Sequence, residues 1–368
     1  MSAGHAAAAH VISAEVGETH FTVHIGDGQI AHLGSLWAER AAGEQALVVF
    51  DGNVAGHAEA AAASLREAGL RTVMAEVPPG ERSKSLSELD RLCREAARAG
   101  IRRADAVVAV GGGVVGDLAG FLAASYLRGV RLVHVPTTLL AMVDSSIGGK
   151  TGVDLPEGKN LVGAIWQPSL VVMDTATLDT LPGRELSCGF AEVVKYGLLD
   201  SPELFDRVEG WPAPLPGPAG PLLDLIRDCV RHKLDVVSQD ERETGLRASL
   251  NLGHTVGHGI EAAAGYERYH HGEAISLGLL AALRIAERIR GLDPAWRDRT
   301  RTVLERHGLP TRLDPEVRTP DILAAMGRDK KADSTALNMV LVDEPGVVLL
   351  RQDPPADMVI SAIEELRA

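Results

Sequence analysis

The sequence has little cysteine, few aromatic residues and no excess of basic charge. Its 368 residues include three cysteines, Cys93, Cys188 and Cys229, an odd and widely spaced set that argues against a disulfide framework. Four Trp, four Tyr and five Phe predict a core filled mainly by Ala, Val and Leu. The formal net charge of −13 excludes a general attraction to nucleic acid or anionic membranes, so an anionic ligand requires a local basic cluster.

Long apolar runs are also lacking. A membrane span needs about 18 apolar residues in a row, and Asp117 and several glycines interrupt the best candidate. The Ala-rich segment 1–10 has no basic stretch followed by an apolar run and a cleavage site, so we expect no secretion signal there. These absences predict a cytoplasmic protein without membrane or nucleic-acid partners.

The order of strand-like and helix-like segments predicts two domains. Before residue 183, short β-rich runs alternate with helical patterns, which is typical of parallel strands with crossover helices. The expected strands are 46–50, 72–77, 106–110, 132–135 and 170–174. Later segments are helical at 184–199, 222–237, 250–264 and 272–289, with strands only at 339–342 and 347–350. We therefore expect an α/β domain over 1–183 and a mainly α-helical domain over 184–368, with a proline-rich loop at 211–218.

A glycine-rich turn follows the predicted strand 106–110. Its sequence, Gly-Gly-Gly-Val-Val-Gly-Asp over 111–117, fits G-x-G-x-x-G between a strand and a helix expected to end near residue 127. In that context backbone N–H groups bind a pyrophosphate at the helix N-terminus. Asp51 directly follows the strand 46–50, where its carboxylate suits a ribose hydroxyl. The glycines also suit a turn that only packs helix on sheet.

Further polar loops add to this half of the chain. The turn 79–84 carries acidic and basic side chains, and 136–138 adds two hydroxyls after a strand. The densest stretch, 144–152, combines glycines and hydroxyls with Lys150, and Lys159 and Asn160 follow it. Such residues at loop positions predict a local cationic nest for a phosphate or carboxylate.

The second half contains candidate metal ligands. His254 and His258 lie four residues apart, on one face of a helix if that helix begins near residue 251. His270 and His271 follow, and Glu192 lies in the helical segment 184–199. Two histidines with one glutamate leave an open coordination position, as in a catalytic metal site. Spacing alone leaves ordinary core or surface histidines equally open.

Together these segments resemble the 3-dehydroquinate synthase family of the sugar phosphate cyclase superfamily. The matching stretches occur in family order: 79–84, 111–117, 125–129, 136–138, 144–152, 158–160, 181–185, 191–197, 240–243, 245–247, 251–258, 271–273 and 329–331. The resemblance implies a Rossmann-like NAD-binding α/β domain, a helical metal- and substrate-binding domain, an active site in the cleft between them, and a homodimer.

The resemblance also assigns roles to matching positions. The implied zinc or cobalt ligands are Glu192, His254 and His271, the last preferred to His270 because it directly precedes Gly-Glu. The implied cofactor positions are Asp51, Asn53, Glu81, Lys84, Gly112, Gly113, Asp117, Thr137, Thr138, Lys150, Lys159, Thr177, Leu178, Asp179 and Thr180. The implied catalytic and substrate positions are Arg128, Asp144, Lys150, Asn160, Lys195, Lys233, Arg247, Asn251 and His258. Lys330 or Lys331 would also reach the site, and Arg128 would cross the dimer interface.

The implied reaction is that of a carbon–oxygen lyase of the shikimate pathway, which leads to chorismate and the aromatic amino acids. It converts 3-deoxy-D-arabino-heptulosonate 7-phosphate to 3-dehydroquinate and phosphate. The steps are transient NAD-dependent oxidation at C5, phosphate elimination, re-reduction, ring opening and aldol closure. Lys150, Asn160, Lys195, His258 and Arg128 would hold the phosphate, whereas Arg247 and Lys233 would face the carboxylate and hydroxyl side.

Three alternatives stay open. A paralogous cyclase of the amino-dehydroquinate, deoxy-inosose or valiolone type shares most motifs, although such enzymes tend to depart at 144–150 or at the second histidine, both kept here. A glycerol-dehydrogenase-like oxidoreductase shares the fold and metal but releases reduced cofactor. A catalytically silent paralogue would not need every metal and lysine position. Two departures also stand out: Asp154 occupies a position that is commonly Asn, and 336–340 match only loosely.

Overall fold

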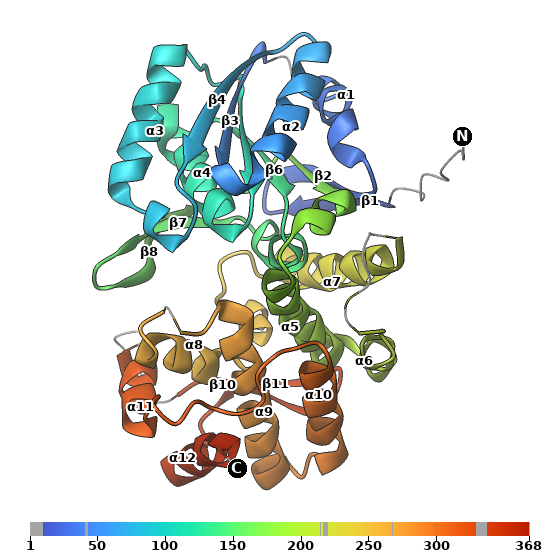
Figure 1. The fold of residues 1–368 in the computed structure, drawn as a ribbon, viewed down its shortest axis with the longest axis vertical. Coiled ribbons are helices and arrows are strands. Elements are labelled where there is room, and N and C mark those ends of the chain that lie inside the picture. The colour runs from blue at the N-terminus through green and yellow to red at the C-terminus, as the bar shows by residue number, and fades with distance from the viewer. Residues whose placement is uncertain are drawn as a thin grey trace. The chain divides into compact units, whose positions relative to one another are not determined.

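The computed structural model describes residues 10–40, 43–213, 215, 220–266, 268–328 and 337–367. The chain forms two compact units (Figure 1). The first contains the described residues up to Leu181 together with α7 (Gly220–Gln239) and the residues that follow it to Arg242, and the second contains the rest. The expected division after residue 183 places α7 with the helical domain, whereas in the structure α7 packs against strands of the first unit.

The first unit is built on a seven-stranded sheet with the order β1-β2-β9-β6-β5-β3-β4. Its strands are β1 (His10–Val16), β2 (Thr19–Gly26), β3 (Gln45–Asp51), β4 (Arg71–Val77), β5 (Ala106–Gly111), β6 (Arg131–Pro136) and β9 (Leu170–Asp174). The pairs β2–β9, β9–β6, β6–β5, β5–β3 and β3–β4 are parallel, and β1–β2 is antiparallel. The central strands are continuous apolar runs because helices cover both faces.

Helices cover both faces of this sheet, and the carboxyl ends of its parallel strands form the edge where a ligand can bind. Side chains of β3 alternate between two cores: Val48 packs with residues of α1 (Leu33–Ala38) and α2 (Ala55–Glu67), and Leu47 packs with residues of α3 (Leu86–Ala99) and α4 (Gly113–Ser125). Figure 1 shows these two pairs of helices on opposite faces of the sheet. The connection after β3 leads to β4, and the connection after β5 leads the other way, to β6. The carboxyl ends of β3 and β5 therefore flank a topological switch point, where open α/β sheets bind ligands.

Two hairpins differ from the sequence expectation. β7 (Lys150–Leu155) pairs with β8 (Gly158–Ile165), so Lys150, Lys159 and Asn160 lie on strands and not in loops. Glycines permit this pairing, since a Cβ on Gly163 would lie 2.1 Å from the Thr151 carbonyl oxygen. The β1–β2 hairpin, His10–Gly26, precedes the first strand expected from the sequence, 46–50.

The second unit is mainly helical, with one β-hairpin. Its α-helices are α5 (Gly183–Asp200), α6 (Pro202–Glu209), α8 (His254–Ala263), α9 (His271–Arg290), α10 (Pro294–Arg306), α11 (Thr319–Arg328) and α12 (Ala356–Glu364), and its strands are β10 (Met339–Glu344) and β11 (Val347–Gln352). α9 lies centrally, and it packs against α5, α8, α10 and α12. Among the described residues, no helix is long and apolar enough to span a membrane.

Short helices connect these elements in both units. They are η1 (Gln29–His32), η2 (Gly52–Val54), η3 (Glu81–Ser83), η4 (Tyr126–Arg128), the π-helix η5 (Ala141–Ser145), η6 (Thr175–Thr180), η7 (Leu246–Asn251) and η8 (Glu365–Arg367). The helix expected over 250–264 begins only at His254, because Gly253 adopts a left-handed φ of 79°. The segment before it is η7.

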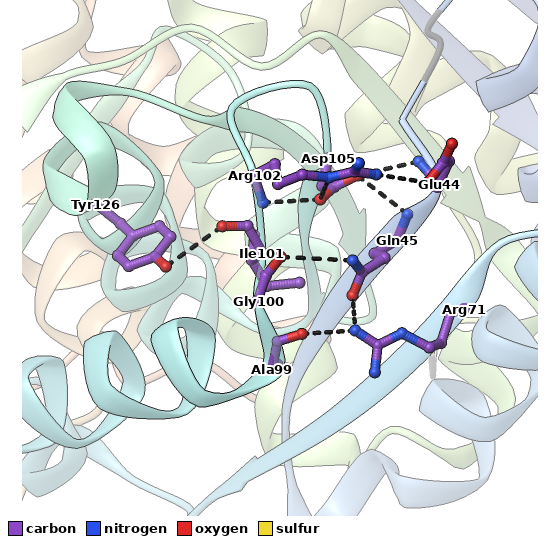
Figure 2. A network of polar contacts seen from close by, with 9 residues as sticks. All are labelled: Glu44, Gln45, Arg71, Ala99, Gly100, Ile101, Arg102, Asp105 and Tyr126. Carbon is purple, nitrogen blue, oxygen red and sulfur yellow. Dashed lines mark hydrogen bonds and ion pairs between the residues drawn. The ribbon is translucent and has the colours of Figure 1, made fainter.

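A buried carboxylate fixes the amino ends of the parallel strands. Figure 2 shows Asp105, whose side chain is 0% exposed, accepting hydrogen bonds from the backbone N–H groups of Glu44 at 3.0 Å, Gln45 at 3.1 Å and Arg102 at 2.7 Å. Arg71 adds bonds to the Gln45 side chain and to the Ala99 carbonyl. The starts of β3, β4 and β5 are therefore joined by one polar network.

We expect Asp105→Ala to lower the free energy of unfolding by about 3 kcal/mol, because three backbone N–H groups and the Arg102 side chain lose a buried, charged acceptor. Chemical unfolding followed by circular dichroism measures the change. Asp27→Ala is the matched control, since Asp27 is exposed and should change stability by less than about 0.5 kcal/mol. Equal unfolding midpoints for the two variants would contradict the anchoring role.

Candidate active site

Three side chains with metal-ligating atoms converge in the second unit. Glu192 lies in α5, His254 is the first residue of α8, and His271 is the first residue of α9. Each offers one ligand atom, and the three atoms lie within 4.8 Å of one another. The Glu192 Oε1 atom is 3.1 Å from His271 Nε2 and 3.5 Å from His254 Nε2. The structure thus brings together the three residues that the resemblance assigns to a metal.

Glycines allow the three helices to approach closely enough for this convergence. A Cβ on Gly272 would lie 2.1 Å from the Cys188 carbonyl oxygen, so α9 meets α5 at backbone contact. A Cβ on Gly278 would lie 2.1 Å from the Gly253 carbonyl oxygen, so α9 also meets α8 at backbone contact. Both close approaches lie beside the ligand residues, and they fix the starts of α8 and α9 near α5.

The hydrogen bonds of the two imidazoles leave Nε2 directed at the carboxylate. His254 Nδ1 donates to the Leu252 carbonyl oxygen at 3.1 Å, and His271 Nδ1 lies 3.3 Å from Glu261 Oε2. Because carbonyl and carboxylate oxygens only accept, each Nδ1 carries a proton. In the neutral imidazole each Nε2 then presents a lone pair toward Glu192. Two imidazole nitrogens and one carboxylate form a donor set typical of catalytic zinc.

The pKa shifts of His254 and His271 show whether these residues suit a divalent metal ion. Burial, reinforced by Lys195, lowers the pKa of His254 to about 3, so this imidazole is neutral. Burial opposes the charged form of His271, but hydrogen bonds to Glu192 and Glu261 outweigh it and raise its pKa to about 10. A proton then separates His271 Nε2 from the carboxylate. A divalent cation at that position satisfies the same lone pairs, so the residues fit a metal.

Lys195 and His258 lie beside the three ligand residues. The Lys195 Nζ atom is 2.5 Å from Glu192 Oε2, one helical turn along α5, and the side chain is 1% exposed. The His258 ring is exposed, and its centroid lies 5.2 Å from that of His254 and 6.0 Å from that of His271. His258 therefore lies next to the candidate group of Glu192, His254 and His271, and it belongs to a second candidate group with Glu261 and His271.

Arg247 and Asn251, both expected at substrate, lie in η7. Arg247 is buried, and Asn251 Nδ2 donates to Glu243 Oε1 at 2.7 Å. Glu243 was not assigned a role from the sequence, although it lies in a matching stretch, and its backbone has a left-handed φ of 58°. This left-handed backbone position beside Asn251 indicates a role for Glu243, and only the structure reveals it.

The expected dinucleotide residues of the first unit follow the carboxyl ends of its parallel strands. Helix α4 begins after Gly112 without a side-chain cap, which leaves its first N–H groups for an anion. A Cβ on Gly112 would lie 3.1 Å from Thr138 Cγ2, and one on Gly113 would lie 3.1 Å from Ser145 Oγ. Thr137 Oγ1 is buried without a hydrogen-bond partner among the described residues. This edge of the sheet fits a nucleotide.

The loops after β3 and β9 contribute unequally to this edge. Asp51 Oδ1 accepts from the Asn53 N–H at 2.9 Å, and burial raises the pKa of Asp51 against that bond. Thr177 and Leu178 are buried, and the Thr177 hydroxyl donates to a backbone carbonyl, so their side chains serve the fold. Two further members of the segment, Asp179 and Thr180, are exposed.

A buried lysine links cofactor and substrate candidates. Lys84 is 4% exposed, and its Nζ lies 2.9 Å from Asp117 Oδ2 and 3.5 Å from Glu81 Oε1, and donates to the side chain of Asn160. Burial would lower the pKa of Lys84, but Asp117 and Glu81 outweigh it and raise the pKa. Lys159 lies at the edge of this cluster, 3.9 Å from Glu81. The charged Lys84 therefore holds the β7–β8 hairpin against the nucleotide edge.

Asp154 takes part in the same cluster. Its Oδ1 accepts from the Asn160 N–H at 2.7 Å and lies 3.9 Å from Lys84 Nζ. This bond stabilises the left-handed φ of 57° at Asn160. An asparagine oxygen could accept the same bond, so the departure at Asp154 keeps the geometry and adds a negative charge.

Asp144 and Lys233 are far apart in sequence but paired in the first unit. Lys233 Nζ donates to both the carboxylate and the backbone carbonyl of Asp144, each at 2.6 Å. The other expected cations here, Arg128 and Lys150, are exposed, and Arg128 has a left-handed φ of 61°. The remaining candidates, Lys330 and Lys331, lie outside the described residues.

Comparison with known proteins identifies relatives over nearly the whole chain. Two family models match, 3-dehydroquinate synthase N-terminal over residues 74–188 and 3-dehydroquinate synthase C-terminal over residues 189–332. A 3-dehydroquinate synthase from Symbiobacterium thermophilum is 49% identical over 359 residues, which cover 96% of this chain and 99% of that protein.

Solved structures of sugar phosphate cyclases share the fold. A 2-deoxy-scyllo-inosose synthase complexed with carbaglucose-6-phosphate, NAD⁺ and Co²⁺ superposes with a TM-score of 0.88 at 28% identity, covering 97% of this chain and 100% of that chain. A 2-epi-5-epi-valiolone synthase from Streptomyces hygroscopicus with NAD⁺ and Zn²⁺ bound gives 0.86 at 28% identity, covering 96% and 98%. With its parallel α/β unit and helical unit, this chain belongs to the 3-dehydroquinate synthase family.

Proposed function

We propose that this chain converts 3-deoxy-D-arabino-heptulosonate 7-phosphate to 3-dehydroquinate and phosphate, with NAD and one Zn²⁺ or Co²⁺ as cofactors. The convergence of Glu192, His254 and His271, with a buried Lys195 beside them, carries the proposal. Support also comes from the 49% identical relative and from the NAD⁺ and metal in related cyclases. When bound, the metal supplies Lewis acidity toward a substrate hydroxyl and NAD supplies a reversible hydride acceptor.

The residues of the second unit bind and orient the substrate in this proposal. Lys195 places a desolvated positive charge beside the metal ligands, where it stabilises negative charge on the substrate. His258 donates a hydrogen bond to the phosphate from its exposed ring. Arg247 offers a planar fork that matches the substrate carboxylate. Asn251, oriented by Glu243, binds a hydroxyl.

The residues of the first unit complete the proposed phosphate and carboxylate contacts. Lys150, Asn160 and Arg128 bind phosphate oxygens and stabilise the charge that develops as phosphate leaves. Asp144 orients the Lys233 ammonium through two hydrogen bonds toward the carboxylate and hydroxyl side. The α4 N-terminus and the threonines after β6 bind the dinucleotide.

The proposal extends to assembly and location. The chain acts in the cytoplasm as a homodimer, in which Arg128 reaches the neighbouring protomer's site, and one of Lys330 and Lys331 contributes to the substrate site. The exposed side chain and left-handed backbone of Arg128 support a role outside its own core. The 28% identity to deoxy-inosose and valiolone synthases, against 49% to a 3-dehydroquinate synthase, favours the latter reaction.

A direct assay with purified protein, NAD, a divalent metal and the heptulosonate phosphate tests the reaction. We expect phosphate release that matches 3-dehydroquinate formation, without accumulation of NADH. Glucose 6-phosphate, sedoheptulose 7-phosphate and the amino analogue of the heptulosonate are the comparison substrates. Faster phosphate release from one of these would assign a paralogous cyclase reaction, and steady NADH accumulation would assign a dehydrogenase.

A further inference from the structure

A second carboxylate lies on the inward face of α8. Glu261 follows His254 by two helical turns and His258 by nearly one, so the three residues share one side of the helix. The Glu261 side chain is 5% exposed, and its Oε2 lies 3.3 Å from His271 Nδ1. Neither the sequence patterns nor the resemblance assigns it a role.

The His271 imidazole therefore lies between two buried carboxylates. Its Nε2 is 3.1 Å from Glu192 Oε1, and its Nδ1 is 3.3 Å from Glu261 Oε2. A buried carboxylate is costly unless it is paired, and the His271 Nδ1 proton is one partner for Glu261, while Glu261 is the acceptor for that proton. The pairing fixes both the tautomer and the plane of the ring.

We propose that Glu261 is a positioning residue for the metal centre: it holds the proton on His271 Nδ1, keeps Nε2 directed at the ion beside Glu192, and is not itself a ligand. The inference rests on the proposed metal function of Glu192, His254 and His271. Such outer carboxylates typically change metal affinity by about 10- to 100-fold when they are removed.

A direct ligand role for Glu261 is the competing arrangement, because Glu261, His258 and His271 also lie close enough to share an ion. That set takes the Nδ1 side of His271, whereas the set with Glu192 takes the Nε2 side. One ring cannot direct both nitrogens at one ion. The buried Glu192 with His254 offers the better enclosed set, since His258 is exposed.

The test compares Glu261→Ala and Glu261→Gln in the full chain. Zn²⁺ and Co²⁺ dissociation constants come from competition with a chromogenic chelator, and the visible spectrum of the Co²⁺ form reports the ligand set. Glu261→Ala should weaken binding by about 10-fold or more. Glu261→Gln retains an oxygen that accepts from Nδ1, so its binding should stay within about 3-fold of the parent, with an unchanged Co²⁺ spectrum. Glu203→Ala, an exposed residue of the same unit, is the control.

Two results would overturn the inference while leaving the metal centre in place. Unchanged affinity in Glu261→Ala would remove the positioning role. A shifted Co²⁺ spectrum with equal losses in folded Glu261→Gln and Glu261→Ala would make Glu261 a ligand. Failure of the parent chain to bind Co²⁺ would instead reject the proposed metal function itself, and this inference with it.

Discussion

His254→Ala should abolish divalent-metal binding and lower kcat/KM by about 10³-fold or more, whereas His258→Ala should keep the metal. The first variant removes one of three ligand atoms that lie within 4.8 Å of one another. Loss of the metal removes several kcal/mol of transition-state stabilisation, and each 1.36 kcal/mol is about tenfold in rate. Metal content after dialysis and steady-state kinetics measure the two effects.

His270→Ala is the matched control for the choice of histidines. His270 directly precedes His271, but its Nδ1 lies 2.9 Å from Glu185 and not beside Glu192. Metal content should therefore stay near the parent value in His270→Ala and in His258→Ala, while His258→Ala loses activity through its phosphate contact. Loss of metal from His258→Ala or His270→Ala would show that the ligand set is wrong.

Gly272→Ala should destabilise the second unit and empty the metal centre together. The added Cβ would lie 2.1 Å from the carbonyl oxygen and 2.5 Å from the Cα of Cys188, and neither backbone atom can rotate away. Helix α9 must shift from α5, which costs about 3 kcal/mol. The shift also carries His271 away from Glu192. Thermal unfolding and metal content measure the combined effect.

Gly56→Ala is the corresponding control, because a Cβ on Gly56 in α2 meets nothing within 4 Å. Alanine is favoured over glycine in a helix by up to about 1 kcal/mol, so this variant should be as stable as the parent or slightly more stable. An unaltered melting temperature and full metal content in Gly272→Ala would mean that α5 and α9 are not in fixed contact.

Local patterns predicted the parallel sheet, most helices and the β10–β11 strands, but missed the β1–β2 and β7–β8 hairpins. Continuous apolar runs such as β5 and the alternating helices signal a parallel sheet, which the structure confirms. The β7–β8 segment is rich in glycine and carries a proline, so its sequence resembles a loop, and its strand character comes from pairing. α7 shows an amphipathic pattern, but such a pattern cannot say which unit covers its apolar face.

The sequence indicated which residues form the candidate site, but not how those residues contact one another. The histidine spacing marks His254 and His258, and the resemblance selects His254 with Glu192 and His271, yet spacing could not place residues from three helices around one point. Glu261 lies on the same helical face as His254, but a lone glutamate in a helix is usually solvated. Its burial, and hence its significance, depends on packing from distant parts of the chain.

The Asp105 network lies at the edge of the sheet opposite the candidate nucleotide residues. It joins the starts of β3, β4 and β5, whereas the candidate nucleotide residues follow the opposite ends of the strands. Stability and ligand choice therefore depend on different residues at opposite edges of one sheet. Loops that follow the strands can be exchanged, in natural divergence or in protein engineering, without disturbing the contacts that hold the strands in register.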